Sequence, residues 1–190
     1  MDALASALRA RIRLEEPEED GLRWAAVALV LRGESASDAA LLFIRRAERV
    51  GDPWSGHVAF PGGRRDVTDL TLEATARRES REEVALDLDA DARMIGVLDD
   101  LRPRSAVLPS IAVRPYVFVL SRAVEVVPNA EVHSTFWMPV SELRDPARVA
   151  QHAVERGGVC VRFPAYRWGD DLVWGMTERI VTQFLSVLAA

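Results

Sequence analysis

The sequence predicts an α/β (α+β) domain, because strand-like and helix-like segments alternate along it. Short, almost wholly apolar runs over 24–31 and 111–120 have the length and composition of buried strands. The helical periodicity of apolar residues predicts amphipathic helices over 70–85 and up to residue 188. No repeat, low-complexity stretch or long linker divides the 190 residues, so we expect one domain over residues 1–190.

The first segment predicts a short helix over residues 1–14, since Leu4, Leu8 and Ile12 recur at helical spacing. A charged stretch with proline and glycine follows it and marks a loop. The core of the domain is then expected between about residues 24 and 188.

The remaining elements follow from apolar runs that are bounded by turn residues. The first two strands flank a polar turn and belong to one sheet, and a short strand precedes the helix near residue 70. A helix is expected to begin at Ser141, and the final helix carries Ile180, Phe184 and Leu188 on one core-facing side. The expected strands cover 24–31, 39–45, 58–60, 93–98, 111–120, 135–140 and one or two short segments within 159–168.

Composition and charge exclude several classes of function. A net charge of −5 argues against a general nucleic-acid-binding surface, which is normally basic. No apolar run approaches the roughly 20 residues that span a membrane, and the N-terminus lacks the apolar segment of a signal peptide. The only cysteine, Cys160, excludes an intramolecular disulfide and is expected to be a small buried residue. We therefore expect a cytoplasmic protein with no nucleic-acid or membrane partner.

The most informative helix is the one over 70–85, whose last turns carry Glu79, Glu82 and Glu83. Residues three and four apart share a helix face, so these carboxylates lie close together. Like charges at this spacing repel, and carboxylates near a helix C-terminus oppose the helix dipole. A hard divalent cation such as Mg²⁺ or Mn²⁺ would relieve both conflicts. The alternative is a solvated acidic face that neighbouring arginines neutralise.

A glycine-rich loop just before this helix favours the metal-binding interpretation. Gly63, five residues, Asp69, eight residues and the run Arg78-Glu79-Ser80-Arg81-Glu82-Glu83 together resemble the Nudix box, the signature of the Nudix hydrolases. The sequence differs from the usual pattern by one extra residue of spacing and by an aspartate as the first acid. Ser80 also replaces an aliphatic residue, and Ala85 replaces a glycine. The Arg-Glu-x-x-Glu-Glu core is intact.

The resemblance implies a Nudix fold, in which a mixed β-sheet lies between helices. It also implies hydrolysis of a diphosphate bond in a nucleoside diphosphate that is linked to another group. In the family, glutamates at the positions of Glu79, Glu82 and Glu83 hold the Mg²⁺ or Mn²⁺ cofactor, which lowers the pKa of a bound water. A carboxylate that the metal does not fully occupy, Glu82 or Glu131, would accept the proton of that water.

Arginines and glycines around the acids are the expected positioning and substrate-binding groups. Arg78 would orient a glutamate through a salt bridge. Gly62 and Gly63 would shape the loop and let a diphosphate approach the backbone closely. Arg45 and Arg49 precede these glycines and would pair with phosphate oxygens.

A second motif narrows the choice of substrate. Residues 41–45 (Leu-Leu-Phe-Ile-Arg) and 56–63 (Gly-His-Val-Ala-Phe-Pro-Gly-Gly) are similar to a motif found before the box in the coenzyme A pyrophosphatase branch of the family. The resemblance implies a small-molecule nucleotide diphosphate substrate. Coenzyme A or acyl-coenzyme A, cut to 4′-phosphopantetheine and adenosine 3′,5′-bisphosphate, is the first choice.

Two other functions fit the same residues. ADP-ribose or another nucleoside diphosphate sugar is an alternative substrate for a hydrolase. A non-catalytic nucleotide-sensing module is the alternative from another class, although such a module has no need of three clustered metal ligands. A homodimer is compatible with each of these functions.

Overall fold

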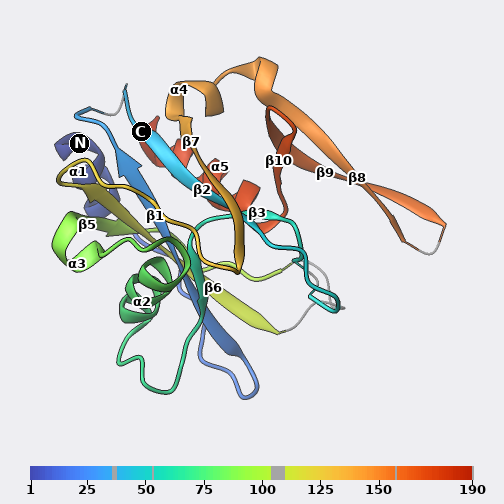
Figure 1. Cartoon of the computed structure of the whole chain (residues 1–190), viewed down its shortest axis with the longest axis horizontal. Coiled ribbons are helices and arrows are strands. Elements are labelled where there is room, and N and C mark those ends of the chain that lie inside the picture. The colour runs from blue at the N-terminus through green and yellow to red at the C-terminus, as the bar shows by residue number, and fades with distance from the viewer. Residues whose placement is uncertain (36–37, 53, 104–109, 157, 190) are drawn as a thin grey trace.

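The computed structural model describes residues 1–35, 38–52, 54–103, 110–156 and 158–189 (Figure 1). Groups of strands are separated by helices along the chain, which confirms the mixed α and β content that the sequence predicts. The helices are α1 (Asp2–Ala10), α2 (Leu72–Val84), α3 (Leu88–Asp91), α4 (Val140–Leu143) and α5 (Met176–Leu188), with a 3₁₀ turn at Pro146–Arg148. The strands are β1 (Arg23–Arg32), β2 (Ala40–Arg46), β3 (Val58–Ala59), β4 (Gly62–Arg64), β5 (Ala92–Val97), β6 (Ile111–Leu120), β7 (Val132–Pro139), β8 (Val149–Arg156), β9 (Val159–Trp168) and β10 (Asp171–Trp174).

The main sheet is mixed, and β1 lies at its centre. The path of strands is β3-β2-β1-β6-β5, with β4 paired to β1 and β7 paired to β2. Strands β1 and β6 are parallel, whereas the other pairs of this sheet are antiparallel. Strand β1 pairs with β2 at Leu31 and Arg32 and with β4 nearer its start, at Ala25 to Val27. The glycines of β4 are therefore held beside the centre of the sheet.

Helices cover both faces of the main sheet, which confirms the predicted mixed sheet between helices. On one face, α2 and α3 pack on the sheet through Leu72, Ala76 and Leu88. On the other face, the helical residues of the core come from α1, α4 and α5, and include Leu4, Leu8, Val140, Ile180 and Phe184. No helix within the described ranges has the length and hydropathy needed to traverse a bilayer.

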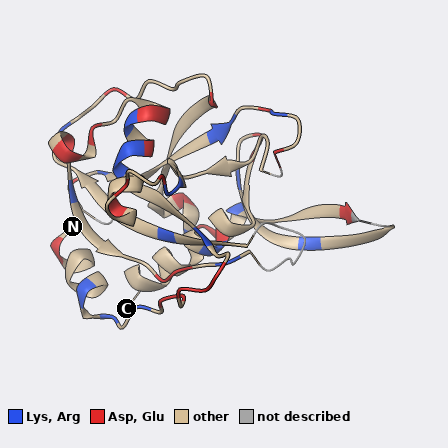
Figure 2. Ribbon diagram, turned by 90° about the horizontal axis from the view of Figure 1, so that it is seen from below, with Lys and Arg blue, Asp and Glu red and all other residues tan. Residues whose placement is uncertain are grey.

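A second, smaller sheet contains β8, β9 and β10, all antiparallel. Strand β10 pairs with the inner part of β9, from Ala165 to Trp168, and the outer part of the β8–β9 hairpin projects from the body (Figure 1). We call this hairpin, residues 149–168, the arm. Its outer residues 159–164 are exposed, and most of its ribbon carries no charge (Figure 2).

Two predictions from the sequence are wrong, and a third, the helix at Ser141, is confirmed only as a single turn. Helix α1 ends at Ala10 and not at residue 14, because Arg11 is extended, and Ile12 is consequently 92% exposed. The helix predicted from Ser141 is the single turn α4, after which the chain forms strand β8. Cys160 is exposed and not buried, since it lies on the outer part of the arm.

Candidate active site

Helix α2 carries three of the candidate glutamates, and local backbone chemistry defines both of its ends. At its start, the Thr71 hydroxyl accepts the N–H of Ala74 at 3.1 Å, as an N-cap residue should. At its end, Ala85 has a φ of +54°, a left-handed conformation that usually requires glycine and costs other residues about 1–2 kcal/mol. The unusual Ser80 is buried, and its hydroxyl donates to the Ala76 carbonyl at 2.8 Å. Both departures from the box pattern are therefore accommodated within the helix.

Strand β4 brings two glycines against the glutamates. The Gly62 N–H donates to Oε2 of Glu83 at 2.8 Å. A Cβ atom at Gly62 would collide with the β1 backbone, and one at Gly63 would collide with the carboxylate of Glu79. Gly62 therefore needs glycine, because the clash is with backbone, whereas a side chain at Gly63 would displace the Glu79 carboxylate from its position.

Arg78 lies between the first acid of the box and two of the glutamates. Its Nε and Nη2 donate to the two carboxylate oxygens of Asp69 at 3.0 and 2.9 Å. Its Nη1 donates to Glu79 at 2.9 Å and to Glu82 at 3.0 Å. Asp69 is buried, and its hydrogen bonds to the Arg78 guanidinium lower the pKa of that carboxyl to about 2. The shorter aspartate thus still forms a bidentate pair, despite the extra residue of spacing.

The glutamates of α2 differ in burial, and burial sets their protonation. Glu83 is 3% exposed, and desolvation raises the pKa of its carboxyl to about 7, with a smaller contribution from the nearby Glu79. Desolvation also raises the pKa of Glu79, although Arg78 acts against it. Glu82 has about half of its side chain exposed. A cation held by Glu79 and Glu83 would favour their charged forms.

Glu131 lies beside this cluster although it is distant in sequence. The loop that carries it is bonded to the end of α2, because the Asn129 N–H donates to the Glu83 carbonyl at 2.8 Å. The Glu131 carboxylate adds to the effect of burial on the pKa of both Glu79 and Glu83. Arg49 pairs with Glu131 at 3.1 Å, and both side chains are half-exposed. The structure therefore brings Arg49 and Glu131 together with the glutamates of α2.

The two arginines at the end of β2 belong to opposite sides of the sheet. Arg45 pairs with Asp171 of β10 at 3.5 Å, on the side of the small sheet. Arg46 acts instead on Glu83, where its charge opposes the effect of burial on the pKa. Arg46 also pairs with Asp52 at 2.8 Å.

Sequence reasoning selected Arg45 and missed Arg46, which is the arginine on the side of the acids. Alternation along β2 was the available signal, since Phe43 packs with α1 and α5 whereas Ile44 packs with α2. Arg46, two residues after Ile44, shares its face. The side chains of Arg46 and Arg49, not that of Arg45, thus join Arg78 next to the glutamate cluster.

The acids fit a divalent cation in their chemistry, but they do not converge on one point. Among the described residues, no three histidine, cysteine, aspartate or glutamate side chains are grouped as a metal site. The oxygens of Glu79 and Glu82 bond to Arg78, and one oxygen of Glu83 bonds to Gly62. All the candidate metal ligands are nevertheless carboxylates, which hard cations such as Mg²⁺ and Mn²⁺ prefer.

The raised pKa of Glu83 predicts that the metal-free protein loses stability as the pH rises. The folded state binds this proton more tightly than the unfolded state, so its contribution is complete below the ordinary pKa of 4.5 and disappears as the pH passes about 7. The free energy of unfolding should fall by about 3 kcal/mol across that window. Urea unfolding in the presence of a chelator, at pH values between 5 and 8, measures this fall in the free energy of unfolding. The Glu83→Gln variant should lack this component, and equal slopes for the two proteins would contradict the prediction.

Comparisons with known proteins agree with this geometry. The NUDIX domain family matches residues 21–156. Over 142 residues the chain is 32% identical to the uncharacterized Nudix hydrolase NudL of Yersinia pestis, covering 74% of this chain and 68% of that protein. Over 110 residues it is 36% identical to an uncharacterized protein of Schizosaccharomyces pombe, of which it spans only 33%. The chain therefore belongs to the Nudix family and is an enzyme of the Nudix hydrolase class.

Solved structures show the same fold at low sequence identity. An Ap4A hydrolase of Caenorhabditis elegans, in a binary complex, aligns with a TM-score of 0.55 at 15% identity, covering 88% of this chain and 98% of that one. A MutT/nudix family protein of Enterococcus faecalis aligns with a TM-score of 0.53 at 15% identity, covering 99% of this chain and 69% of that one. These likenesses confirm the predicted Nudix fold.

Proposed function

We propose that this protein hydrolyses the diphosphate bond of a nucleoside diphosphate derivative in a metal-dependent reaction, with coenzyme A or acyl-coenzyme A as the first candidate substrate. The observation that carries the proposal is the environment of Glu83. This glutamate is buried, receives the Gly62 N–H and lies close enough to Glu79 and Glu131 for their charges to raise its pKa further. A carboxylate cluster of this kind suits a hard cation and its bound water.

In this reaction Glu79, Glu82 and Glu83 would hold Mg²⁺ or Mn²⁺, which when bound neutralises the diphosphate and lowers the pKa of the attacking water. The residues of the chain orient the groups around it. The Gly62 N–H fixes one oxygen of Glu83, and Arg78 fixes Glu79 and Glu82. Glu82 or the half-exposed Glu131 accepts the proton of the water.

Arginines next to the acids bind the phosphates in this proposal. Arg49 is half-exposed and already holds a carboxylate, Glu131, at 3.1 Å, so its guanidinium can pair with a phosphate in the same way. Arg46 lies on the same side, and its Nε is buried without a partner among the described residues. Both cations stabilise the negative charge that develops on the leaving phosphate.

Support for coenzyme A comes from the motif at residues 41–45 and 56–63, of which Gly62 and Gly63 lie against the glutamates of α2. ADP-ribose or another nucleoside diphosphate sugar is the alternative substrate, because the cluster itself recognises only the diphosphate. A homodimer and a cytoplasmic location stay predictions from the sequence.

A substrate panel tests the proposal. Purified protein with Mg²⁺ or Mn²⁺ would receive coenzyme A, an acyl-coenzyme A, ADP-ribose and a nucleoside diphosphate sugar, and mass spectrometry would identify the products. We expect metal-dependent release of 4′-phosphopantetheine and adenosine 3′,5′-bisphosphate. Cleavage of ADP-ribose alone would refute the coenzyme A proposal and keep the reaction class. Nucleotide binding without cleavage of any compound would favour the sensing module.

A further inference from the structure

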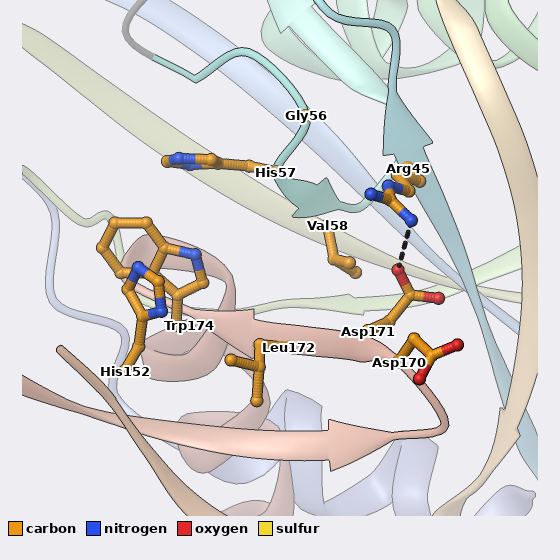
Figure 3. Close-up of a pocket in the computed structure, with 9 residues that line it drawn as sticks. All are labelled: Arg45, Gly56, His57, Val58, His152, Asp170, Asp171, Leu172 and Trp174. Carbon is orange, nitrogen blue, oxygen red and sulfur yellow. Dashed lines mark ion pairs between the residues drawn. The ribbon is translucent and has the colours of Figure 1, made fainter. Parts of the chain in front are cut away.

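A pocket of about 240 Å³ lies between the main sheet and the small sheet, on the side of Arg45 (Figure 3). The end of β2 and the loop before β3 form one wall, and β8, β10 and the turn before β10 form the other. The residues that bear on its chemistry are Arg45, His57, His152, Asp170, Asp171 and Trp174. Pockets that hold a whole small molecule are usually about 300–1,000 Å³, so this one accommodates a single part of a larger ligand.

Aromatic rings from three separate segments meet in this pocket. The indole of Trp174 lies with its ring centre 4.6 Å from that of His57 and 4.1 Å from that of His152. Figure 3 shows both imidazoles against the indole. The imidazoles are tilted from the indole plane by 55° and 36°, so the rings form an aromatic lining and not a pair of parallel walls. An aromatic lining favours a planar ligand, because a nucleic-acid base stacks on an aromatic side chain with about 1–3 kcal/mol.

The charges in the pocket favour an uncharged ligand over a phosphate. Arg45 and Asp171 form an ion pair at 3.5 Å, which the dashed line in Figure 3 marks. Asp170 adds a further negative charge at the rim. Burial lowers the pKa of His57, with a further contribution from His152, so the His57 imidazole is neutral near pH 7. Carboxylates in such surroundings accept hydrogen bonds from ribose hydroxyls or an exocyclic amine.

The pocket adjoins the glutamate cluster around the edge of the sheet. Arg46 does not line the pocket, but it links the two sites, since its charge acts on Glu83 of the cluster and on His57 of the pocket. The backbone N–H of Arg46 also donates to the His57 carbonyl at 3.0 Å. A substrate whose diphosphate lies at the glutamates would therefore reach the pocket with an adjacent group.

We propose that this pocket binds the nucleoside half of the substrate, with its base against Trp174, His57 and His152 and its hydroxyls or amine toward Asp171. The inference rests on the proposed function for the position of the diphosphate, but it needs no diphosphate to be tested. Pantetheine, the uncharged part of coenzyme A, is flexible and has no ring, so it would gain little from these walls, whereas the adenosine part of coenzyme A would have to keep its ribose phosphate outside the pocket.

Calorimetric titration of the metal-free full chain with adenosine, guanosine, cytidine and uridine tests the proposal. We expect at least one of them to bind, and its Kd to rise about tenfold or more in Trp174→Leu and in His152→Leu. His152 lies on the arm, so its replacement leaves the core packing intact. Trp168→Leu is the matched control, because Trp168 is in the same small sheet but its ring contacts Arg148.

Any one of three results would overturn the proposal: the protein binds none of the four nucleosides, it binds pantetheine in their place, or the wild-type protein and both pocket variants bind a nucleoside with equal affinity. Hydrolysis assays separate this failure from that of the proposed function. In the hydrolysis of a nucleoside diphosphate compound, the His152→Leu variant should show a raised KM with little change in kcat. A protein that binds a nucleoside through Trp174 but cleaves nothing would refute the hydrolase and keep the pocket.

Discussion

Replacing Glu83 by glutamine is expected to lower kcat by about 10²- to 10⁴-fold, measured at saturating Mg²⁺ or Mn²⁺ and substrate. The substitution removes one negative charge from the cluster but keeps an oxygen that can accept the Gly62 N–H. The variant should therefore remain folded. At pH 7 it should also be no less stable than the wild-type protein, because it buries no charge at this position.

The matched control for this substitution is Glu73→Gln on the same helix. Glu73 pairs with Arg77 in its own helix and takes no part in the glutamate cluster. Its replacement should leave kcat within a few fold of the wild-type value. Normal turnover in Glu83→Gln would contradict the mechanism. If the wild-type protein shows no turnover and Glu83→Gln binds nucleotide with the wild-type affinity, the result would instead point to a sensing module.

Replacing Arg78 by methionine is expected to destabilise the protein by about 3 kcal/mol at pH 7. The loss follows because Asp69 would stay buried without its bidentate partner. Thr75 and the Asp66 N–H still donate to Asp69, which keeps the loss at the lower end of the range for a broken buried pair. Urea unfolding monitored by circular dichroism measures the difference.

Two further variants show whether the buried carboxylate is the cause. Arg81→Met removes an arginine of the same helix whose ion pairs are exposed, and should cost less than about 1 kcal/mol. Asp69→Asn added to Arg78→Met should recover part of the loss, since the uncompensated charge disappears. Equal losses in Arg78→Met and Arg81→Met, or no recovery in the double variant, would refute this account of Arg78.

The fold and the glutamate cluster could be predicted because local patterns determine them. The apolar runs give β1, β2 and β6, and helical spacing alone brings Glu79 and Glu83 together on α2. The Gly62–Glu83 bond joins residues that are 21 positions apart in the chain, yet the resemblance to the Nudix box pointed to the same loop.

Other features depend on tertiary packing and could not be predicted in this way. Alternation along β2 separates Arg45 from Arg46, but β2 is apolar on both faces before them, so only the packing of α2 on the side of Ile44 shows that Arg46 is the one near the acids. A strand within 159–168 was predicted and corresponds to β9, but its partner β8 was missed because β8 has little apolar periodicity and few buried neighbours. The same exposure leaves Cys160 in solvent. Ile12 does not lie on the helix because the backbone becomes extended at Arg11, and no local residue pattern predicts that the helix ends there.

The arm has a consequence for how the enzyme responds to heat. A two-stranded hairpin with both faces in water is only marginally stable by itself, and the outer part of the arm has that exposure. It should therefore open locally at a smaller free-energy cost than the body, where α2 packs on the main sheet. Because His152 belongs to the arm and the glutamates belong to the body, warming should loosen recognition of the nucleoside first. Hydrolysis of the diphosphate bond would then persist to a higher temperature than discrimination between substrates with different nucleosides.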